Sequence, residues 1–300
     1  MNINKLLGSL LLIIALAGCT ENLVELGENT YSPKIVVEGY LFANQKVENI
    51  KVTRNFPLNS SIQVSSIVLS NADVSIKELE SGKDFKLTFN TQKFTFEYAG
   101  NDLFIDYGKE YQLNVSAIVD GKRLNASSIT KVPQKGFKIN RELSQFDPIF
   151  YREPDAMGTT KSFVLNFTPS PGTKFYLISL LALDASDKTF VYDNPYFEIK
   201  KEDLNKELDR FRLQANQLPN INSFGGNIEY EIPWLDLWFY GNHRLIVYAV
   251  DENYRLYFQT YGSVQEFDGN FHEPRFNFIG EGIGVFGSAI ADTVYLTVKK

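Results

Sequence analysis

Three glycines near the end of the chain have the spacing of a dinucleotide-binding motif: Gly282, Gly284 and Gly287 spell G-x-G-x-x-G. That motif holds a pyrophosphate only where it follows a strand and opens a helix, whose N-terminal amides bind the anion. Only 13 residues remain after Gly287 (300 − 287), and they lead into a predicted strand. We therefore predict a bulged strand or tight bend that needs positive φ or close backbone packing, and no nucleotide site.

Residues suited to nucleophilic catalysis are few. The chain has one cysteine and two histidines, and it lacks the G-x-S-x-G sequence of a hydrolase nucleophile. His243 follows Asn242 in a predicted turn and His272 lies in a polar stretch, so both are interpreted as solvated loop histidines. Two histidines without a free cysteine do not build an ordinary structural zinc site. We expect a protein that is not an enzyme and that carries no cofactor or metal ion.

Carboxylates leave two further possibilities open. Asp184, Asp187 and Asp193 lie in one predicted loop region, but they lack the D-x-D-x-D-G spacing of a calcium loop. Aspartate is also common in surface turns for conformational reasons. A carboxylate pair for glycoside hydrolysis depends on a separation in space of about 5 to 10 Å, which sequence spacing does not reveal. A hydrolase is therefore kept as the least favoured hypothesis.

Both tryptophans lie in one aromatic segment, where Trp234 is followed by Trp238, Phe239 and Tyr240. Aromatic rings with a polar tip suit contacts with sugars or protein partners. We take Trp234, Trp238 and Tyr240 as a candidate binding surface. The alternative, which we favour, is a packed corner between two sheets. The exposure of the rings decides between the two.

The single cysteine, Cys19, ends the sequence LAGC at residues 16–19, after a short apolar stretch that carries Lys5. This is the layout of a bacterial lipoprotein signal, in which the cysteine becomes the lipidated first residue of the mature protein. The apolar run is shorter than the roughly 20 residues of a membrane span. We predict a signal peptide over residues 1–18, lipid attachment at Cys19 and a tether over residues 19–32.

The charge and the cysteine count restrict the partners of this chain. Loss of the signal removes Lys5, so the formal net charge of -6 becomes -7. An acidic chain without a Lys/Arg cluster lacks the basic surface that nucleic acids require. No disulfide can form within the chain, so stability must come from core burial. No aspartate follows Cys19 directly, which favours the outer membrane, with the cell surface preferred to the periplasmic face.

Residues 33–134 are predicted to form a β-sandwich of the immunoglobulin-like or transthyretin-like kind. Short alternating apolar runs follow one another with turn residues about every ten positions, and no helical period interrupts them. The strongest hairpin signal is Asp120-Gly121, because it lies between alternating segments and suits a turn with positive φ at both positions.

Residues 135–300 are predicted to form a second β-rich domain that carries two helices. Apolar residues at helical spacing predict one helix near residues 200–218. Asp251 is a predicted N-cap for another helix over residues 251–266. The predicted fold class is therefore mainly β.

Seven motifs are spread over nearly the whole mature chain: PKIVVEG at 33–39, GKEYQLNV at 108–115, Asp120-Gly121, Val132-Pro133, Asp236-x-x-Phe239-x-Gly241, the Tyr-rich helix after Asp251, and IGEGIGVFG at 279–287. Together they resemble a family of Bacteroidetes outer-membrane lipoproteins described only as a domain of unknown function, the domain-of-unknown-function-4249 family. The last motif is the most specific. Glu281 and Phe278 depart from the family's pattern, which has an asparagine and a glycine pair before an I/L-G-x-F-G run.

The resemblance implies a lipid-anchored outer-membrane protein that acts as a non-catalytic accessory or partner, often of a TonB-dependent transporter or another outer-membrane barrel. It transfers no catalytic residues, because none are established for the family. The alternative is a surface glycan- or nutrient-binding lipoprotein, which needs an exposed aromatic platform. The membrane itself is the expected partner of the acyl chains on Cys19, and no nucleic acid is expected.

Overall fold

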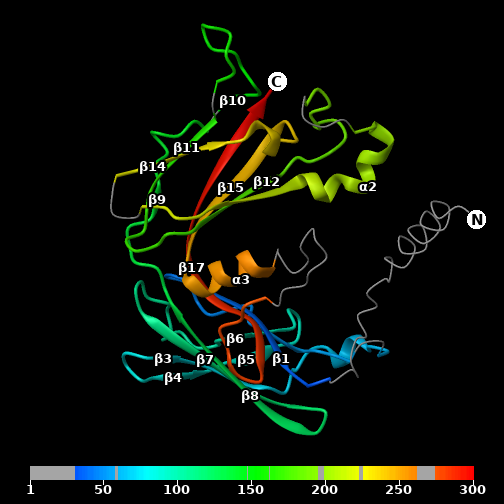
Figure 1. The fold of residues 1–300 in the computed structure, drawn as a ribbon, viewed down its shortest axis with the longest axis vertical. Helices are drawn as coiled ribbons and strands as arrows, with labels where there is room; N and C mark the ends of the chain where they lie inside the picture. Colours follow the sequence, from blue (N-terminus) through cyan, green and yellow to red (C-terminus); the bar gives the residue numbers. More distant parts are fainter. Residues whose placement is uncertain are drawn as a thin grey trace, which may run out of the picture. The chain divides into compact units, whose positions relative to one another are not determined.

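The computed structural model describes residues 31–57, 60–146, 148–161, 163–194, 199–222, 226–261 and 274–300. Residues 33–55 and 62–300 form one compact unit. The unit is mainly β, as predicted, and the helices among its described residues are α2 (Lys201–Arg212), α3 (Glu252–Tyr261) and two short 3-10 turns (Figure 1). Cys19 and the predicted signal peptide lie outside the described residues. Within the described part, no helix is long and apolar enough to cross a membrane.

A seven-stranded sheet, called the long sheet below, runs through both halves of the chain (Figure 1). Six of its strands are, in spatial order, β13 (Leu213–Leu218), β12 (Tyr176–Ala182), β15 (Gly241–Val250), β17 (Gly282–Lys299), β1 (Ile35–Phe42) and β2 (Lys51–Arg54), and β10 (Ile149–Phe150) pairs with the end of β17. The first part of β17 pairs in parallel with β1, and its second part pairs antiparallel with β15. One 18-residue strand thereby joins the two halves of the sheet.

The first half of the chain forms a β-sandwich, as predicted. A five-stranded sheet has the order β16 (Ile279–Gly280), β8 (Lys122–Lys131), β7 (Glu110–Val119), β3 (Asp73–Glu78) and β4 (Asp84–Lys86), and β5 (Thr88–Asn90) pairs with β6 (Thr95–Glu97). The inward-facing residues of the five-stranded sheet pack against those of β1 and β2 in one core, which includes Val37, Val52 and Val115. Because β16 and β17 come from the end of the chain, the domain boundary at residue 134 stays a prediction.

The turn between β7 and β8 is the hairpin predicted from Asp120-Gly121. Asp120 has φ 50° and Gly121 has φ 77°, so both turn positions have positive φ. Ten residue pairs follow on from this two-residue connection, from Val119 opposite Lys122 to Glu110 opposite Lys131. The turn sets the register, and the register places the apolar side chains of both strands on the inner face.

The glycine-rich end of the chain is a strand, and it begins with close backbone packing. Gly284 has φ 109°, and a Cβ atom there would lie 2.0 Å from the backbone oxygen of Val37. Gly280 has φ 88°, and its Cβ would lie 2.2 Å from the backbone oxygen of Asn125. The prediction of positive φ and close packing is confirmed. Residues 282–299 form one continuous strand, so the G-x-G-x-x-G run opens no helix.

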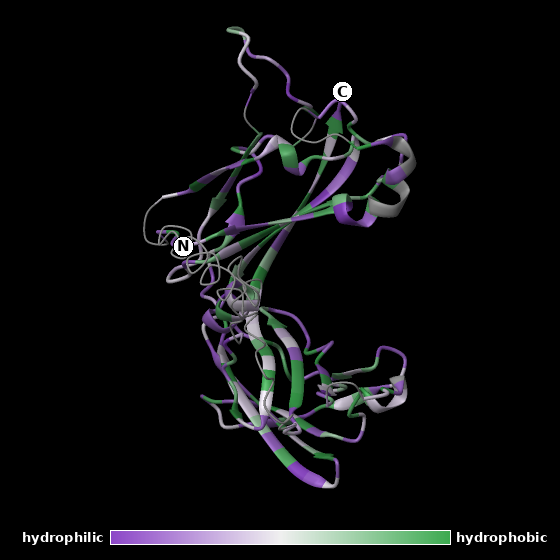
Figure 2. Ribbon diagram, turned by 45° about the vertical axis from the view of Figure 1, so that its right-hand side comes forward, coloured by the Kyte–Doolittle hydropathy of each residue, from purple (hydrophilic) through white to green (hydrophobic). Residues whose placement is uncertain are grey.

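In the second half, a three-stranded sheet covers one face of the long sheet. Its order is β14 (Ile228–Ile232), β11 (Phe163–Thr168) and β9 (Lys138–Ile139). Between the two sheets lies a second core, which includes Phe167, Tyr176 and Val247. A third core forms under α2, where Leu204 and Phe211 are buried. Hydrophobic and hydrophilic residues alternate along many of these strands (Figure 2).

The helix predicted near residues 200–218 is only partly correct. It ends at Arg212, and Leu213–Leu218 continues as β13, which pairs antiparallel with β12. The change begins at Leu213, whose backbone is extended at φ −118° and ψ 120°. The free edge of β12 supplies hydrogen-bond partners that no local sequence window contains, so tertiary pairing overrides helical spacing. The second predicted helix is confirmed over Glu252–Tyr261, and its predicted end at residue 266 lies outside the described residues.

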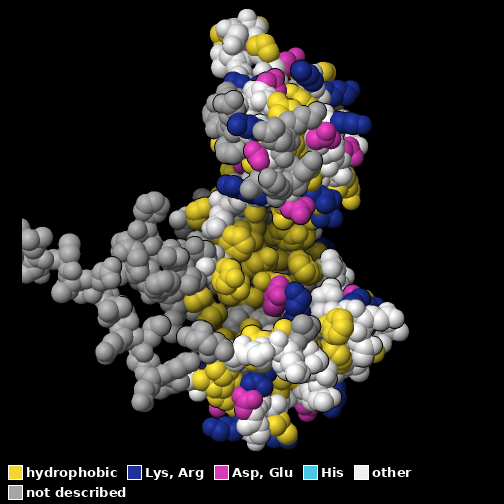
Figure 3. Space-filling model, turned by 90° about the vertical axis from the view of Figure 1, so that its right-hand side faces the viewer, with side chains coloured by type: hydrophobic (Ala, Val, Ile, Leu, Met, Phe, Trp, Pro, Cys, Tyr) yellow, Lys and Arg dark blue, Asp and Glu magenta, His cyan; other side chains and the backbone are white. Residues whose placement is uncertain are grey.

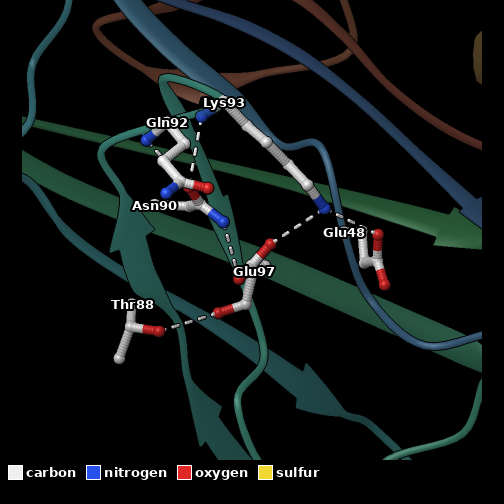
Figure 4. Close-up of polar contacts among 6 residues, drawn as sticks. All are labelled: Glu48, Thr88, Asn90, Gln92, Lys93 and Glu97. Carbon is white, nitrogen blue, oxygen red and sulfur yellow. Dashed lines mark hydrogen bonds and ion pairs between the residues drawn. The ribbon is translucent and has the colours of Figure 1, made fainter.

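A polar network lies on the surface of the β5–β6 hairpin (Figure 4). Lys93 Nζ donates to Glu48 Oε2 at 3.1 Å and to Glu97 Oε2 at 3.3 Å, and Asn90 Nδ2 donates to Glu97 Oε1 at 2.9 Å. The Lys93 and Glu48 side chains are almost half exposed, so water weakens their attraction. We interpret this network as a support for the turn.

Candidate functional site

The aromatic segment predicted as a binding surface is divided between two cores. Pro233 is followed by the 3-10 turn η2 (Trp234–Asp236), and Asp236 accepts a hydrogen bond from the Asn216 side chain of β13. Trp234 packs at the edge of the second core, whereas Trp238 belongs to the third. The two tryptophans therefore form no shared platform.

Trp238 is a core residue with only 8 % of its surface exposed. The centroid of its ring lies 4.7 Å from that of the Phe211 ring. The Trp238 ring is also stacked on Phe190, with 6.0 Å between the two centroids. The neighbouring Phe239 is fully buried. The assignment of Trp238 to a binding surface is wrong, because α2 brings Phe211 onto its ring. This part of the segment is the packed corner.

Tyr240 is half-buried and has a structural partner. Its hydroxyl donates to Asp193 Oδ1 at 3.3 Å, and its ring lies edge-on to Tyr151 at 5.9 Å. Burial, reinforced by Asp193, raises the pKa of Tyr240 to about 12, so the phenol is neutral at pH 7. We interpret its contacts as packing.

The aspartates considered for calcium do not gather into a metal site. Asp184 Oδ2 accepts from the Asn242 amide at 2.8 Å, while Asp193 accepts from Tyr240. In the part of the chain that the structure describes, no group of three His, Cys, Asp or Glu side chains could hold a metal ion. The two carboxylates instead stabilise the backbone and a ring around the aromatic segment.

His243 is buried, contrary to the prediction of a solvated loop. It is 2 % exposed and lies in β15, which begins at Gly241 and so includes the position predicted as a turn. Alternation then places His243 on the inner face with Leu245 and Val247. Burial lowers the pKa of His243, which keeps the ring neutral at pH 7. His272 lies outside the described residues.

Trp234 lines an open cleft of about 800 Å³, which is the candidate ligand site. Trp234 Nε1 donates to the Lys161 backbone oxygen at 3.0 Å, and its ring lies edge-on to Tyr151 at 5.5 Å. These contacts hold the indole at the wall of the cleft. The other lining residues include aromatic Phe146, Phe150 and Tyr295 and polar Arg141, Ser144, Gln145, Glu153, Lys161 and Thr293.

The charged side chains at the cleft are paired. Arg141 Nη2 lies 3.1 Å from Asp292 Oδ1 and also donates to the Thr293 backbone oxygen, while Lys161 Nζ lies 2.7 Å from Glu153 Oε2. Glu153 is the one carboxylate residue among the described residues that line the cleft. Aromatic walls with compensated charges at the rim suit a neutral, partly apolar ligand.

Sequence reasoning found Trp234 and missed its neighbours in the cleft. Tyr295 is 66 % exposed and Phe150 is 43 % exposed. A signal for Tyr295 was present, because Val294 and Leu296 are the apolar members of an alternating strand and leave Tyr295 facing outward. No signal identified Phe150 or Arg141, since both reach the cleft from loops and a two-residue strand far from Trp234 in sequence.

A second surface, the tyrosine face, lies on α3 and on the face of the long sheet next to it (Figure 3). Helix α3 has no buried residue, although it is rich in aromatic side chains. Tyr254 packs on Tyr40 of β1 at 4.5 Å, and Tyr257 is stacked on Tyr261 at 5.3 Å. The tyrosine face is made of Tyr40, Phe42, Tyr248, Tyr254, Tyr257, Phe258 and Tyr261.

Asp251 positions α3 as the predicted N-cap. Its Oδ1 accepts from the amides of Tyr254 at 3.0 Å and Ser288 at 3.1 Å, and its Oδ2 accepts from Thr130 Oγ1 at 2.6 Å. One carboxyl group thereby ties the helix to β17 and to β8. Asp251 is 8 % exposed, and burial raises its pKa to about 6 in spite of these hydrogen bonds.

The raised pKa of Asp251 predicts a pH-dependent stability. Because the folded protein favours the protonated Asp251 carboxyl group, protonation of this group stabilises the fold. The stabilisation is complete below pH 3.8, the pKa of the group in the unfolded chain, and it is lost as the pH rises through about 6, its pKa in the folded protein. The change is on the order of 3 kcal/mol. We expect the stability of wild type relative to Asp251→Asn, measured by urea unfolding, to fall between pH 4 and pH 7. A difference that is constant over this range would contradict the prediction.

Comparison with known proteins identifies the family of this chain and names no ligand for it. A family model described as "Domain of unknown function (DUF4249)" matches residues 21–290. No curated protein matches. Two similar solved structures are the FN1–FN3 domains of chicken CNTN1 (11% identity, 89% of this chain, 67% of that chain, TM-score 0.18) and the chicken interferon gamma receptor alpha chain (10% identity, 73% of this chain, 88% of that chain, TM-score 0.18). Because the family model covers most of the sequence, the chain belongs to the DUF4249 family.

Proposed function

We propose that this protein is a lipid-anchored, non-catalytic accessory of an outer-membrane barrel, and that the barrel is a TonB-dependent transporter. The observation that carries the proposal is the tyrosine face. Helix α3 leaves every one of its residues at least partly exposed, and Tyr261 is 61 % exposed. A contiguous aromatic surface favours a partner, because tyrosine supplies large contact area at low entropic cost.

Burial favours the uncharged form of three tyrosines of the tyrosine face. Burial raises the pKa of Tyr254 to about 12, and it also raises the pKa of Tyr40 and of Tyr257. The phenols are therefore neutral donors and acceptors that can enter an interface without the cost of burying a charge.

The predicted anchor supports a partner in the same membrane. Lipid attachment at Cys19 leaves 14 residues, 19–32, before Pro33. Even fully extended, such a segment spans at most about 50 Å. Such an anchor would keep the start of β1 at Ile35, and with it the strand that carries Tyr40 and Phe42, within reach of the membrane surface. A membrane-embedded protein is thereby held at high effective concentration.

Co-purification from detergent-solubilised membranes tests the proposal. With an affinity tag at the C-terminus, we expect a β-barrel transporter, identified by mass spectrometry, to be recovered with the full-length protein. The Cys19→Ser chain, which cannot be acylated, serves as the control and should recover much less. If the anchored protein is recovered alone, the accessory role is wrong.

The tyrosine face itself is tested by a paired substitution. Tyr257→Ser with Tyr261→Ser removes a stacked pair from α3 and should reduce barrel recovery by about tenfold or more, since interface aromatics are frequent hot spots. Ile118→Ser is the matched control, because Ile118 is 63 % exposed on β7. Equal recovery with both variants would remove the tyrosine face from the proposal.

A further inference from the structure

The long sheet has a gap in its strand pairing at the Trp234 cleft. On one side, β17 is paired with β15 from Ala289 to Val298. On its other side, β17 is paired with β1 only as far as Ala289, and with β10 only from Val298. Among the described residues, therefore, no strand pairs with residues 290–297 on that side. This open edge is roughly 25 Å long at about 3.3 Å per residue.

The backbone groups that point into the gap can be identified from alternation. The Ala289 oxygen accepts from the Ala43 amide at 3.1 Å, and the Lys299 oxygen accepts from the Tyr151 amide at 2.8 Å. Since alternate residues of a strand direct their amide and carbonyl groups to the same edge, the odd-numbered residues between them face the gap. The intervening even-numbered residues face β15.

One of these odd-numbered residues is already capped by side chains. The Thr293 oxygen accepts from Arg141 Nη2 at 2.9 Å, and the Thr293 amide donates to Asp292 Oδ1 at 2.8 Å. Tyr295 and Thr297 have no such cap in the described part of the chain. Their amide and carbonyl groups form an edge that can pair with another strand.

Part of this edge lines the cleft, and the chemistry of the cleft suits an extended peptide. The cleft is lined by Thr293, Val294 and Tyr295 of β17, and by Trp234 and Phe150. A strand beside β17 would lie about 4.8 Å from it and direct alternate side chains toward opposite faces of the sheet. The aromatic walls then suit apolar side chains, while the backbone supplies the hydrogen bonds.

We propose that an extended segment of the partner barrel adds to the long sheet as a strand along β17, between β1 and β10, and pairs with the backbone of Tyr295 and Thr297. This inference rests on the proposed function and specifies how the barrel is held. The open edge presents backbone donors and acceptors at the regular spacing of a strand. An added peptide strand uses this spacing, whereas a bound saccharide or lipid chain would not require it.

Hydrogen exchange of the co-purified complex tests this pairing at residue resolution. In the free protein, the amides of Tyr295 and Thr297 should exchange rapidly. In the complex, their exchange should slow by about 100-fold, as expected for amides that enter a sheet. The amides of Val294 and Leu296 are internal controls, because they face β15 and should be protected in both states. Tyr295 and Thr297 amides that exchange as fast in the complex as in the free protein would overturn the inference, although the accessory role would stand.

A proline substitution provides an independent test. Tyr295→Pro removes the amide that faces the gap and leaves the ladder to β15 intact, because proline is tolerated where the missing N–H faces an open edge. Tyr295→Thr keeps the amide and removes the same ring. Both variants lose the ring that lines the cleft, so the difference between them reports on the amide alone, and we expect barrel recovery to be about tenfold lower for Tyr295→Pro than for Tyr295→Thr.

The outcomes of these tests are separable. Recovery of wild-type protein without a barrel overturns the proposed function. Equal losses for Tyr295→Pro and Tyr295→Thr, or no loss for either, overturn strand addition. Circular dichroism shows whether Tyr295→Pro folds, and hydrogen exchange of the wild-type complex decides the question if it does not.

Discussion

Replacing Gly284 by alanine is expected to destabilise the protein by more than about 4 kcal/mol, a large part of the 5–15 kcal/mol that a whole domain commonly has. The new Cβ atom would lie 2.0 Å from the Val37 backbone oxygen, and the position has φ 109°. The obstructing atom belongs to the paired strand β1, so relief requires the parallel β1–β17 pairing to open. We expect the variant to be recovered unfolded or degraded, as judged by yield and circular dichroism.

Gly172→Ala is the matched control for this prediction. Gly172 also has positive φ, at 80°, but no atom lies within 4 Å of the position its Cβ would take. Gly172→Ala should therefore lower the free energy of unfolding only by the backbone strain of about 1–2 kcal/mol. If Gly284→Ala proved as mild as Gly172→Ala, the close contact between β17 and β1 would be contradicted.

Trp238→Ala is expected to cost about 3–5 kcal/mol, because the substitution leaves a cavity in the third core. The indole is stacked on Phe190 and tilted against Phe211, so its loss also separates α2 from the long sheet. Urea unfolding followed by circular dichroism measures the change. The neighbouring Leu235 is 44 % exposed, and Leu235→Ala should cost less than about 1 kcal/mol.

This comparison distinguishes a core tryptophan from a ligand-binding one. Trp238→Ala should change stability strongly, whereas a residue of an exposed platform would change binding and leave stability almost unaffected. A loss below about 1 kcal/mol for Trp238→Ala would return it to the candidate binding surface. Trp234 is the tryptophan of the cleft in either case, since it is among the residues that line it.

Local chemistry accounts for the features that the sequence predicted correctly. The Asp120-Gly121 turn and the Asp251 N-cap each depend on the conformational preference of one or two residues and on bonds to near neighbours. Alternation of apolar residues predicted the sandwich, since a strand that is buried on one face must carry that period. The glycine run that contains Gly284 was predicted to need positive φ or close packing, although the backbone that contacts Gly284 lies far away in the chain.

The errors arose where distant segments compete with local preference. Leu213–Leu218 has residues compatible with a helix, but it becomes a strand because β12 offers an edge. His243 was placed in a turn, and the pairing of β15 with β17 extends the strand through it. Trp238 could have been exposed or buried on sequence grounds alone, and Phe211 from α2 decides the outcome.

The sequence by itself determined the fold class, the family and the absence of a recognised catalytic motif, because each depends on residue types and their spacing. It also predicted an anchor at Cys19, which stays a prediction. Only the tertiary structure decided which residues share a surface. The G-x-G-x-x-G run shows the difference: its spacing is readable in the chain, but its role follows from the backbone of β1, which lies against Gly284 and leaves no room for a side chain. The gap beside Tyr295 has the same origin, since it exists only where two strands distant in sequence stop pairing with a third.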